Sequence, residues 1–428
     1  MSSKGTQKND LKINKDKNPA QSGLKQILFV WSYLEWGGAQ IYFLALMRSV
    51  SGQFEVRAVL PNGSDKKILE YLEASNIEYD FFEGNIDLSK AKSIGQRIKR
   101  RWNDFITNVS LGRHLSGYDL RNSIVQIDVA PWAGFALLFY LIMKTDVFVT
   151  FHTAIPELPF WRRTLWKTKF AILTASKRFH LVASNSDVKK SLRAFVNEAR
   201  YRQIEIVYSS VNTEEIKTVL QDDQTRSEIA RKYNFPPEKI WVCNVAQFIE
   251  RKGCWVFLEA IEILRKQRSD LYFFWLGTAP LEKETVERIG GYDLENNFRF
   301  LSADEIGASR RDLLTLWRAA DLFVLPSFQE GLPVALIEAM ALGRACIASN
   351  INAVPEAVKH LENGLLVEAG DSRKLARAIG DLADDRFMRE KLGENAHKYV
   401  LKNFDEKIIG DKMRRLYEKI SCPATTSI

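Results

Sequence analysis

Residues 321–340 have the sequence DLFVLPSFQEGLPVALIEAM, and this stretch indicates both the fold and a ligand site. It begins with a short apolar run typical of a buried strand, turns in a loop that contains Gly331, and continues as a helical pattern. Pro333 suits a first helical position because its φ is fixed. The first N–H groups of a helix have no partner within it, so those of Val334 and Ala335 are predicted to form an anion site.

Two glutamates flank this helix start. Glu330 lies just outside the predicted helix, and Glu338 lies a little over one turn inside it. Either glutamate alone is most simply an acid on a solvated surface. Together with a strand end, a neighbouring glycine and a helix start, they indicate a site, because open parallel sheets bind ligands beyond the carboxyl ends of their strands.

Short apolar runs and helical patterns alternate along the rest of the chain. Helical patterns such as those of 254–267 and 373–384 separate most of the runs. The runs are 26–31, 55–60, 124–128, 146–151, 181–184 and 205–208, followed by 240–248, 271–277, 298–302, 321–326, 345–349 and 364–367. This alternation predicts an α/β protein with two doubly wound, Rossmann-like domains that face each other across a cleft.

Local composition sets the expected boundaries of these domains. Residues 1–25 are rich in lysine and have no apolar core, which predicts a disordered leader and no signal peptide. The stretch around 213–238 is polar and rich in turn residues. We therefore expect one domain over 26–213 and a second over 214–402.

Composition and cysteine usage exclude several classes of protein. Of the 428 residues, 46% are hydrophobic and 27% are charged, as in ordinary globular proteins. The four cysteines form no C-x-x-C pair, so a disulfide framework and a zinc ribbon are disfavoured and a reducing, cytoplasmic location is expected. The longest apolar stretch, 129–143, is shorter than the about 20 residues that a spanning helix needs.

The positive charge lies in the first half of the chain. Residues 1–213 hold 30 Lys and Arg against 19 Asp and Glu, a net charge of +11, whereas 214–428 hold 31 against 34, a net charge of −3. Such a field favours an anionic partner, which leaves nucleic acid, a phospholipid surface and a phosphorylated substrate open. No nucleic-acid recognition motif supports the first of these, so we expect no nucleic-acid partner.

The motif EGLPVALIE at 330–338 resembles the E-x7-E signature of retaining glycosyltransferases with the GT-B architecture. Its continuation, AMALGRACIASN followed by VPE and NGLLV, resembles family 4 of that class, the group 1 glycosyl transferases. The resemblance implies transfer of a sugar from a UDP- or GDP-linked donor to a hydroxyl acceptor in glycan, polysaccharide or glycolipid synthesis. It also implies that 403–420 packs back on the first domain. A non-catalytic relative that binds a sugar nucleotide or a lipid head remains the alternative.

The resemblance assigns roles to residues at several strand ends. VAQFIERKG at 245–253 resembles G-R-L-x-x-x-K-G, in which Arg and Lys hold the donor diphosphate; Lys252 matches the Lys, and Gln247 replaces the Arg. Glu330 is expected to contact the donor sugar, Glu338 the ribose, and His152 a sugar hydroxyl. The expected donor-binding residues are Gly37, Gly38, Gln247, Lys252, Gly331, Leu332, Pro333, Val334, Ala335 and Glu338. The expected catalytic residues are Glu330, His152 and Lys252.

The chain contains no D-x-D motif of the kind that holds a divalent metal on a diphosphate. The departing diphosphate is therefore expected to be stabilised by Lys252 and backbone N–H groups, with no metal cofactor. Retaining transfer on the front face of the sugar, with the leaving phosphate accepting the acceptor's proton, is what the resemblance implies.

Two basic segments with aromatic residues, 88–103 and 158–178, indicate where the acceptor side meets its surroundings. No acid lies between Asp87 and Asp104, and none lies within 158–186. Such segments suit a peripheral contact with the anionic cytoplasmic face of a membrane, although a solvated basic face over core aromatics explains them too. The residues expected at this surface are Arg97, Arg100, Arg101, Trp161, Arg162, Arg163, Trp166, Lys167 and Lys169.

Overall fold

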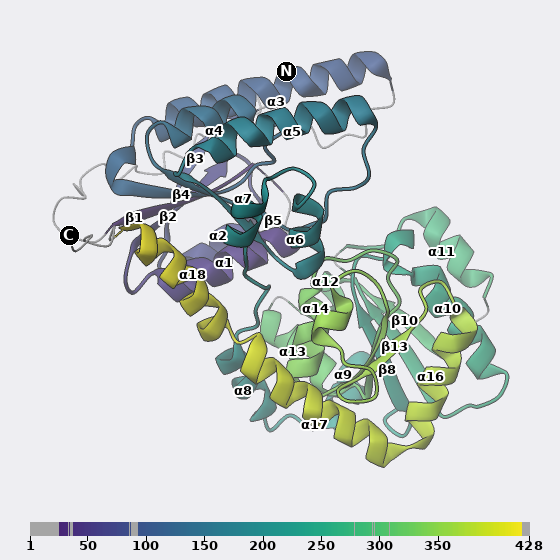
Figure 1. The fold of residues 1–428 in the computed structure, drawn as a ribbon. Helices are drawn as coiled ribbons and strands as arrows, with labels where there is room; N and C mark the ends of the chain where they lie inside the picture. Colours follow the sequence, from purple (N-terminus) through teal and green to yellow (C-terminus); the bar gives the residue numbers. More distant parts are fainter. Residues whose placement is uncertain are drawn as a thin grey trace, which may run out of the picture.

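The computed structural model describes residues 25–421, apart from residues 33, 35, 36, 85, 87–92, 278, 293, 295 and 308. Two α/β domains lie side by side and are joined by a linker and by the last helix, which returns from the second domain to the first (Figure 1). The predicted leader lies outside the described residues except for Lys25. Within the described ranges, no helix is long and apolar enough to cross a membrane.

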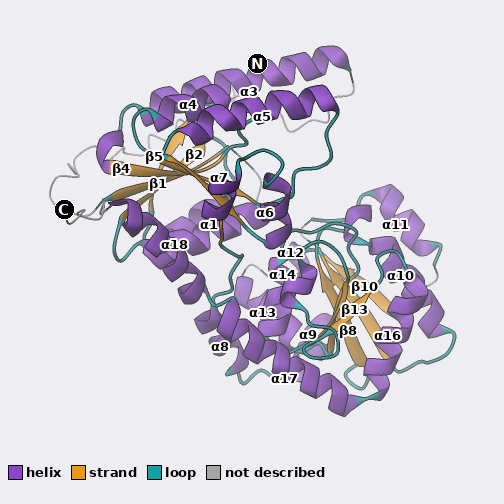
Figure 2. Cartoon of the chain, in the orientation of Figure 1, coloured by secondary structure: helices purple, strands orange, loops and turns teal. Residues whose placement is uncertain are grey.

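The first domain contains a parallel sheet of seven strands in the order β3-β2-β1-β4-β5-β6-β7. Helices cover both faces of this sheet (Figure 2). The strands are β1 (Gln26–Trp31), β2 (Glu55–Pro61), β3 (Glu78–Phe82), β4 (Ser123–Asp128), β5 (Asp146–Phe151), β6 (Phe179–Ala183) and β7 (Glu205–Ile206). The helices are α1 (Gly38–Val50), α2 (Lys66–Ala74), α3 (Ile94–Leu115), α4 (Phe135–Ile142), α5 (Phe160–Ala175), α6 (Ser186–Leu192) and α7 (Glu198–Gln203), with the 3-10 turn η2 (Leu120–Asn122).

Alternate residues of the central strand β1 enter two separate cores, which explains why the strand is apolar throughout. Ile27, Phe29 and Trp31 pack with α1, α2 and the returning helix α18 (Glu406–Ser421). Leu28 and Val30 pack on the opposite face with α3, α4 and α5. A parallel strand covered on both faces has no solvated side, so it shows a continuous apolar run instead of alternation.

The second domain contains a parallel sheet of six strands in the order β10-β9-β8-β11-β12-β13. The strands are β8 (Ile240–Val245), β9 (Leu271–Leu276), β10 (Phe298–Leu301), β11 (Leu322–Leu325), β12 (Ala345–Ser349) and β13 (Leu365–Val367). The helices are α8 (Thr213–Leu220), α9 (Arg226–Tyr233), α10 (Cys254–Arg265), α11 (Lys283–Gly290), α12 (Ala303–Ile306), α13 (Arg310–Arg318), α14 (Val334–Ala341), α15 (Val354–Ala357), α16 (Ser372–Asp384) and α17 (Arg386–Asn403), with the 3-10 turn η3 (Glu250–Lys252).

The doubly wound α/β class is confirmed, and one strand was missed. Strand β3 lies at the edge of the first sheet and has the sequence EYDFF, in which charged residues alternate with aromatic ones. Only Phe82 of this strand is buried, so it lacks the apolar run that marks a central strand. The predicted strand 205–208 is shorter than expected, because β7 covers Glu205–Ile206 alone.

The last helix ties the end of the described chain to the first domain. Arg48 of α1 forms an ion pair with Glu406 at the start of α18. Gly410 packs so close to Ser49 that an added Cβ would lie 2.0 Å from the serine's Cβ, which explains the glycine at this crossing. Further along α18, the hydroxyl of Tyr417 donates a buried hydrogen bond of 2.9 Å to Oε1 of Gln126 on β4.

Candidate active site

The strand order locates the candidate site. In each sheet the order reverses between two adjacent strands, β1 and β4 in the first domain and β8 and β11 in the second. Ligands of doubly wound proteins bind in the crevice at such a reversal, beyond the carboxyl ends of the strands. The loops that follow β8 and β11 carry Lys252 and Glu330, so both residues lie at the predicted place.

Lys252 and Glu330 are in direct contact. The Lys252 ammonium donates to Oε1 and Oε2 of Glu330 at 2.7 and 2.8 Å. The hydroxyl of Ser327 donates to Oε1 at 2.7 Å, and the Glu330 N–H donates to Oδ1 of Asn352 at 3.2 Å. The Glu330 side chain is only 6% exposed, so its carboxylate is held in one orientation by buried donors.

A glycine fixes the approach of the Lys252 loop to the Glu330 loop. Gly253 has a φ of +74°, and a Cβ added there would lie 2.0 Å from the carbonyl oxygen of Pro326. Any side chain at this position would push the two loops apart and strain the backbone. The K-G pair of the sequence motif therefore has a packing reason, because the glycine brings the lysine to the end of β11.

Helix α14 begins as the sequence predicts, with a shift of one residue. Pro333 is the N-cap, and Val334 is the first helical residue. The Pro333 carbonyl accepts from the N–H of Leu336 at 3.1 Å, which leaves the N–H groups of Val334 and Ala335 at the open end of the helix. Leu332 and Pro333 are buried, so the backbone that joins Glu330 to these N–H groups is held in place by packing.

The loop after β11 also contacts the first domain. A Cβ added to Gly331 would lie 2.8 Å from the carbonyl oxygen of His152, the residue after β5. The same carbonyl accepts from the hydroxyl of Ser184 at 3.2 Å. The strand ends that carry Glu330 and His152 therefore meet between the domains.

The His152 imidazole is buried among groups of the first domain. Its Nε2 lies 3.4 Å from Oδ2 of Asp128, at the end of β4, and its ring meets the ring of Tyr42 edge-on at 4.8 Å. Burial lowers the pKa of His152, and the Asp128 carboxylate opposes this shift. The imidazole is thus neutral near pH 7. Sequence analysis did not single out Asp128, although its position at a strand end could have indicated it.

Glu338 lies in a second polar cluster. Its buried carboxylate forms an ion pair with Arg310 of α13, whose Nε also donates to Glu215 of α8 at 2.9 Å. Burial raises the pKa of Glu338, and Arg310 opposes this shift. The cluster lines a small cavity of about 20 Å³ that also touches Ser210 and Arg48. Arg310 was not expected, because nothing in the sequence connects positions 28 residues apart.

Other residues that were expected to bind the donor have fewer packing contacts than Lys252 and Glu330. Gln247 is exposed in the loop after β8. Arg251, the residue that could replace a missing arginine there, donates to the carbonyl of Gln329 at 3.1 Å and is exposed as well. Gly37 caps α1, and Gly38 begins it with nothing within 4 Å of an added Cβ. Packing therefore does not require a glycine at position 38.

Two of the residues expected at a membrane surface are placed elsewhere. Trp166 is 7% exposed and stacks on Trp132 with ring centroids 3.9 Å apart, so it belongs to the core. Lys169 donates to the Trp132 carbonyl at 2.9 Å, and burial lowers its pKa. Both residues lie on the inner face of α5, a side that the sequence pattern did not distinguish. The exposed residues of the set are Arg97, Arg100, Arg101, Trp161, Arg163 and Lys167, with Arg162 half-buried.

A contact between the domains was also missed. Glu356 of α15 accepts from the N–H and hydroxyl of Ser186, at 3.0 and 2.8 Å, and from the hydroxyl of Tyr208 at 2.8 Å. Ser186 begins α6 of the first domain, and Tyr208 precedes α8. The VPE tripeptide was noted as part of a motif, but its contact role depends on the tertiary fold.

Comparison with known proteins supports the family assignment. Residues 225–399 match the family model of glycosyl transferases group 1. The N,N'-diacetylbacillosaminyl-diphospho-undecaprenol alpha-1,3-N-acetylgalactosaminyltransferase of Campylobacter jejuni is 31% identical over 154 residues, which cover 35% of this chain and 40% of that protein. Overall, the chain covers between 34% and 62% of the lengths of the curated relatives that it matches.

Solved structures extend the similarity of fold to both domains. A glycosyltransferase from Rickettsia africae superposes with a TM-score of 0.74 at 18% identity, over 93% of this chain and 99% of the other. Anabaena HepE in complex with UDP and glucose gives a TM-score of 0.71 at 17% identity, over 92% and 100%. The second domain is therefore similar to the glycosyl transferases group 1 family, and the two domains together have the GT-B architecture.

Proposed function

We propose that the chain is a retaining, metal-independent glycosyltransferase of family 4. It would move a sugar, a hexose or similar, from a nucleotide-sugar donor to a hydroxyl of an acceptor in glycan, polysaccharide or glycolipid synthesis. The observation that carries this proposal is the contact between Lys252 and Glu330 at the sheet reversal of the second domain. It combines a fixed cation and a fixed carboxylate with an open helix start, which suits a sugar joined to a diphosphate.

Lys252 and α14 would stabilise the leaving diphosphate. An ammonium group has three donors, and in the structure two acceptor oxygens of Glu330 engage it. A donor is thus left for a phosphate oxygen. The N–H groups of Val334 and Ala335 add positive potential at the helix start. This is an electrostatic route to leaving-group stabilisation that requires no metal.

Glu330 would hold the donor sugar while its anomeric carbon becomes positive. The bond from this carbon to the phosphate oxygen breaks, and a bond to the acceptor oxygen forms on the same face. The acceptor's proton passes to the released phosphate oxygen, so no nucleophile from the protein is needed. A carboxylate held by Lys252 and Ser327 can accept from a sugar hydroxyl without reorienting.

The remaining roles follow from the positions of His152 and Glu338. The neutral His152 would exchange a hydrogen bond with a sugar hydroxyl at the first domain's edge of the cleft. Glu338 would accept hydrogen bonds from the ribose hydroxyls of the nucleotide. Its carboxylate would then accept from the ribose and from Arg310 at the same time.

Two similar proteins support the donor and acceptor classes. HepE was solved with UDP and glucose, and the Campylobacter relative acts on a diphospho-undecaprenol, which is a lipid-linked substrate. We propose a UDP- or GDP-linked donor and a glycan or lipid-linked acceptor for this chain. The exposed basic residues of α3 and α5 would then contact an anionic membrane surface peripherally, from the cytoplasmic side.

A donor screen tests the proposal. A nucleotide-sugar at 100 times its Kd should stabilise the protein by about 2.7 kcal/mol in thermal unfolding. Lys252→Ala should lose this stabilisation, whereas the control Lys266→Ala, at an exposed lysine directly after α10, should keep it. Glu330→Ala should bind the nucleotide yet lower turnover by about 10²-fold, because it positions the reacting sugar.

Release of free nucleotide, raised by a lipid or glycan acceptor mixture, should persist in excess chelator. Loss of this activity that only manganese or magnesium restores would contradict the metal-independent route. Binding without any release would favour the alternative, a non-catalytic relative that binds a sugar nucleotide or a lipid head. No stabilisation by any UDP- or GDP-sugar would contradict the donor class.

A further inference from the structure

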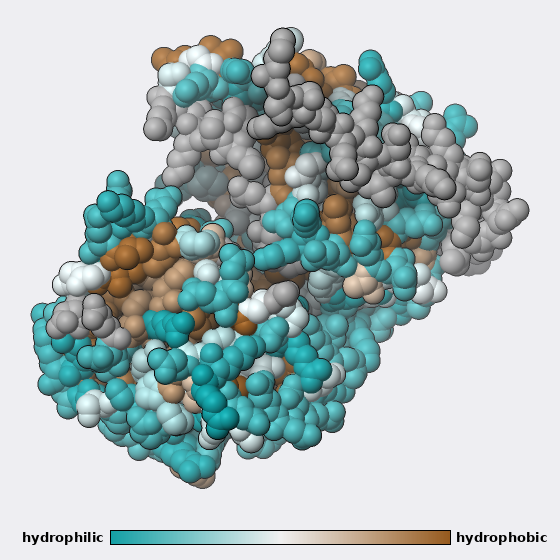
Figure 3. Space-filling view, turned by 180° about the vertical axis from the view of Figure 1, so that it is seen from behind, coloured by the Kyte–Doolittle hydropathy of each residue, from teal (hydrophilic) through white to brown (hydrophobic). Residues whose placement is uncertain are grey.

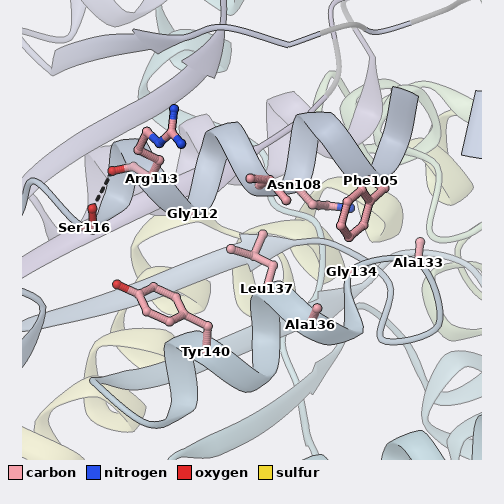
Figure 4. A pocket seen from close by; sticks show the side chains of 11 residues that line it. Phe105, Asn108, Gly112, Arg113, Ser116, Ala133, Gly134, Ala136, Leu137 and Tyr140 are labelled. Carbon is pink, nitrogen blue, oxygen red and sulfur yellow. Dashed lines mark hydrogen bonds between the residues drawn. The ribbon is translucent and has the colours of Figure 1, made fainter. Parts of the chain in front are cut away.

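The first domain contains a cavity that the proposed transfer reaction does not use. It lies between α3 and α4 and has a volume of about 350 Å³, within the range of small-molecule sites (Figure 4). Its walls are mostly apolar, with a few polar groups at the rim. The lining residues include Phe105, Val109, Gly112, Ala136, Leu137 and Tyr140.

Two glycines and one alanine keep this cavity open. Gly112 of α3 faces Leu137 of α4, and an added Cβ would lie 3.3 Å from the leucine's Cδ1. A Cβ added to Gly134 would lie 2.1 Å from Cγ1 of Val129, so no side chain fits in the turn before α4. Ala136 is exposed on the α4 wall. The close-up shows Phe105 and Leu137 turned into the space between the two helices (Figure 4).

Exposed apolar side chains continue from the cavity along α3. Ile98, Trp102, Phe105 and Val109 are 64%, 62%, 52% and 49% exposed, and their spacing of three or four residues places them on one face of the helix. This face is separate from the buried one, which carries Thr107, Leu111 and Leu115. Phe160 and Trp161 at the start of α5 are exposed as well. Figure 3 shows hydrophobic residues at this end of the molecule. An exposed apolar surface of this kind marks an interaction site.

Positive charge surrounds the apolar face. Helix α3 carries Arg97, Lys99, Arg100, Arg101 and Arg113 against the single acid Asp104, and the outer side of α5 carries Arg162, Arg163 and Lys167, with no acid in the helix. Arg113 lies at the rim of the cavity itself. Apolar side chains bordered by Lys and Arg suit a surface whose interior is hydrocarbon and whose head groups are anionic.

The topology places this surface beside the acceptor side of the cleft. Helices α3, α4 and α5 each follow a strand, so their first turns lie at the carboxyl edge of the first sheet. That edge also carries His152 and faces the second domain. The exposed start of α5 therefore lies at the edge that carries the candidate active site, and the cavity lies farther along, beside the later turns of α3.

We propose that the cavity between α3 and α4 receives one hydrocarbon chain of an anionic membrane phospholipid, whose head group lies among the arginines of α3 and α5. The cavity would make the membrane contact specific, because a chain that enters it fixes the position of the domain on the bilayer. The proposed membrane contact supplies the source of the lipid, and this is the one part of the inference that rests on the proposed function. Chain binding itself is measurable without membrane, donor or acceptor.

The first experiment uses single-chain probes in solution, below their critical micelle concentration. Dodecyl phosphate should bind at least about tenfold more tightly than butyl phosphate, because each buried CH₂ adds about fourfold. Ala136→Phe should fill the cavity and abolish the preference. Val109→Trp is a second variant with the same purpose, and its site is half exposed. Ala74→Phe, at an exposed alanine of α2 on the other side of the sheet, should bind as the wild type does.

The second experiment uses vesicles. The wild type should bind vesicles of phosphatidylglycerol and not of phosphatidylcholine, and both cavity variants should bind the anionic vesicles about tenfold more weakly. Nucleotide-sugar stabilisation should stay unchanged in these variants, which separates this inference from the proposed function.

Three results would overturn the inference. One is equal binding of dodecyl and butyl phosphate by the wild type. Another is unchanged vesicle or dodecyl phosphate binding by a cavity variant that is folded by circular dichroism. The third is a lipid-free dimer of the wild type that a cavity variant dissociates in sedimentation, since the groove would then be an interface with a second copy.

Discussion

Glu338 and Arg310 form an ion pair in which the carboxylate is buried and the guanidinium is partly exposed. Removing the carboxylate leaves the Arg310 guanidinium with Glu215 alone, and an incompletely paired, partly buried charge is costly. We expect Glu338→Ala to lower the free energy of unfolding by about 3 kcal/mol, the lower end of the range that is typical when a buried ion pair loses one partner. It should also raise the KM for the donor more than it lowers kcat, because a ribose contact is made in both the ground and transition states.

Urea unfolding and steady-state kinetics measure these two effects separately. Glu215→Ala is a matched control that removes the other carboxylate of the same arginine, so it should destabilise the fold without the change in KM. A Glu338→Ala protein with an unchanged donor KM would contradict the ribose assignment, whatever its stability.

His152 should make stability depend on pH. Burial lowers the pKa of His152 in the folded state below its usual value of about 6.5, so the folded protein binds fewer protons there than the unfolded chain. The resulting stability is fully present above pH 6.5 and is lost as the pH falls below it, by at most about 1.4 kcal/mol per pH unit. The free energy of unfolding of His152→Asn should therefore fall less between pH 7.5 and 5.5 than that of the wild type.

Denaturant unfolding at several pH values checks the sign. Burial also lowers the pKa of His114, but that histidine is present in both proteins, so its contribution cancels in the difference. Parallel pH profiles for the two proteins would mean that His152 takes up a proton as readily in the folded state as in the unfolded chain.

The return of helix α18 to the first domain was expected, but the contacts that hold it there were not. Its residues were expected to return to the first domain, but its contacts with α1 and β4 join positions more than 290 residues apart. The Gln126 amide donates to Thr150 at 2.7 Å and accepts from Tyr417, so the buried side chain is satisfied at both ends. A sequence pattern contains no information on such pairings.

Removing the Tyr417 hydroxyl should therefore show how much its hydrogen bond to Gln126 contributes to stability. Tyr417→Phe leaves the Gln126 oxygen buried without that donor, which should cost about 1–3 kcal/mol of unfolding free energy. Tyr140→Phe, at a partly exposed tyrosine of α4, is the matched control and should cost little. Thermal unfolding of both variants measures the difference, and equal Tm values would mean that the Gln126 bond adds nothing to the docking of α18.

The elements that sequence predicts well are those with a local cause. The central strands are apolar because helices cover both faces, and α14 begins after Pro333 for a local steric reason. Sequence also predicted Lys252 and Glu330 at the ends of strands, and the structure has both after the strands that meet at the sheet reversal. The edge strand β3 and the Arg310 partner of Glu338 depend on tertiary neighbours and were missed.

The side of a helix that is buried is the remaining source of error. Trp166 and Trp161 belong to the same aromatic and basic helix, yet Trp166 stacks on Trp132 and Trp161 is 65% exposed. Composition of the segment alone predicts both residues at a surface. The distinction depends on which face of α5 meets α4 and the sheet, which only the packed domain defines.

At the scale of the whole molecule, Glu356 connects the two domains. Its carboxylate accepts from the free N–H at the start of α6, where the helix dipole favours a negative charge, and from the hydroxyls of Ser186 and Tyr208. The same closed arrangement brings Gly331 next to the carbonyl of His152. Transfer between the domains needs both strand ends at one substrate, so the bonds of Glu356 would favour the arrangement that is competent for catalysis.

We therefore expect Glu356→Ala to open the molecule. Hydrogen bonds to a carboxylate contribute about 2 kcal/mol, so their loss should shift the closed-to-open ratio by roughly 30-fold. Small-angle scattering should show a larger radius of gyration, and kcat/KM should fall while donor binding to the second domain persists. Glu362→Ala, at an exposed glutamate of the following loop, is the matched control. Tyr208→Phe removes one of the bonds and should give an intermediate effect. An unchanged radius of gyration together with unchanged turnover in Glu356→Ala would mean that packing between the domains, and not this carboxylate, holds the cleft closed.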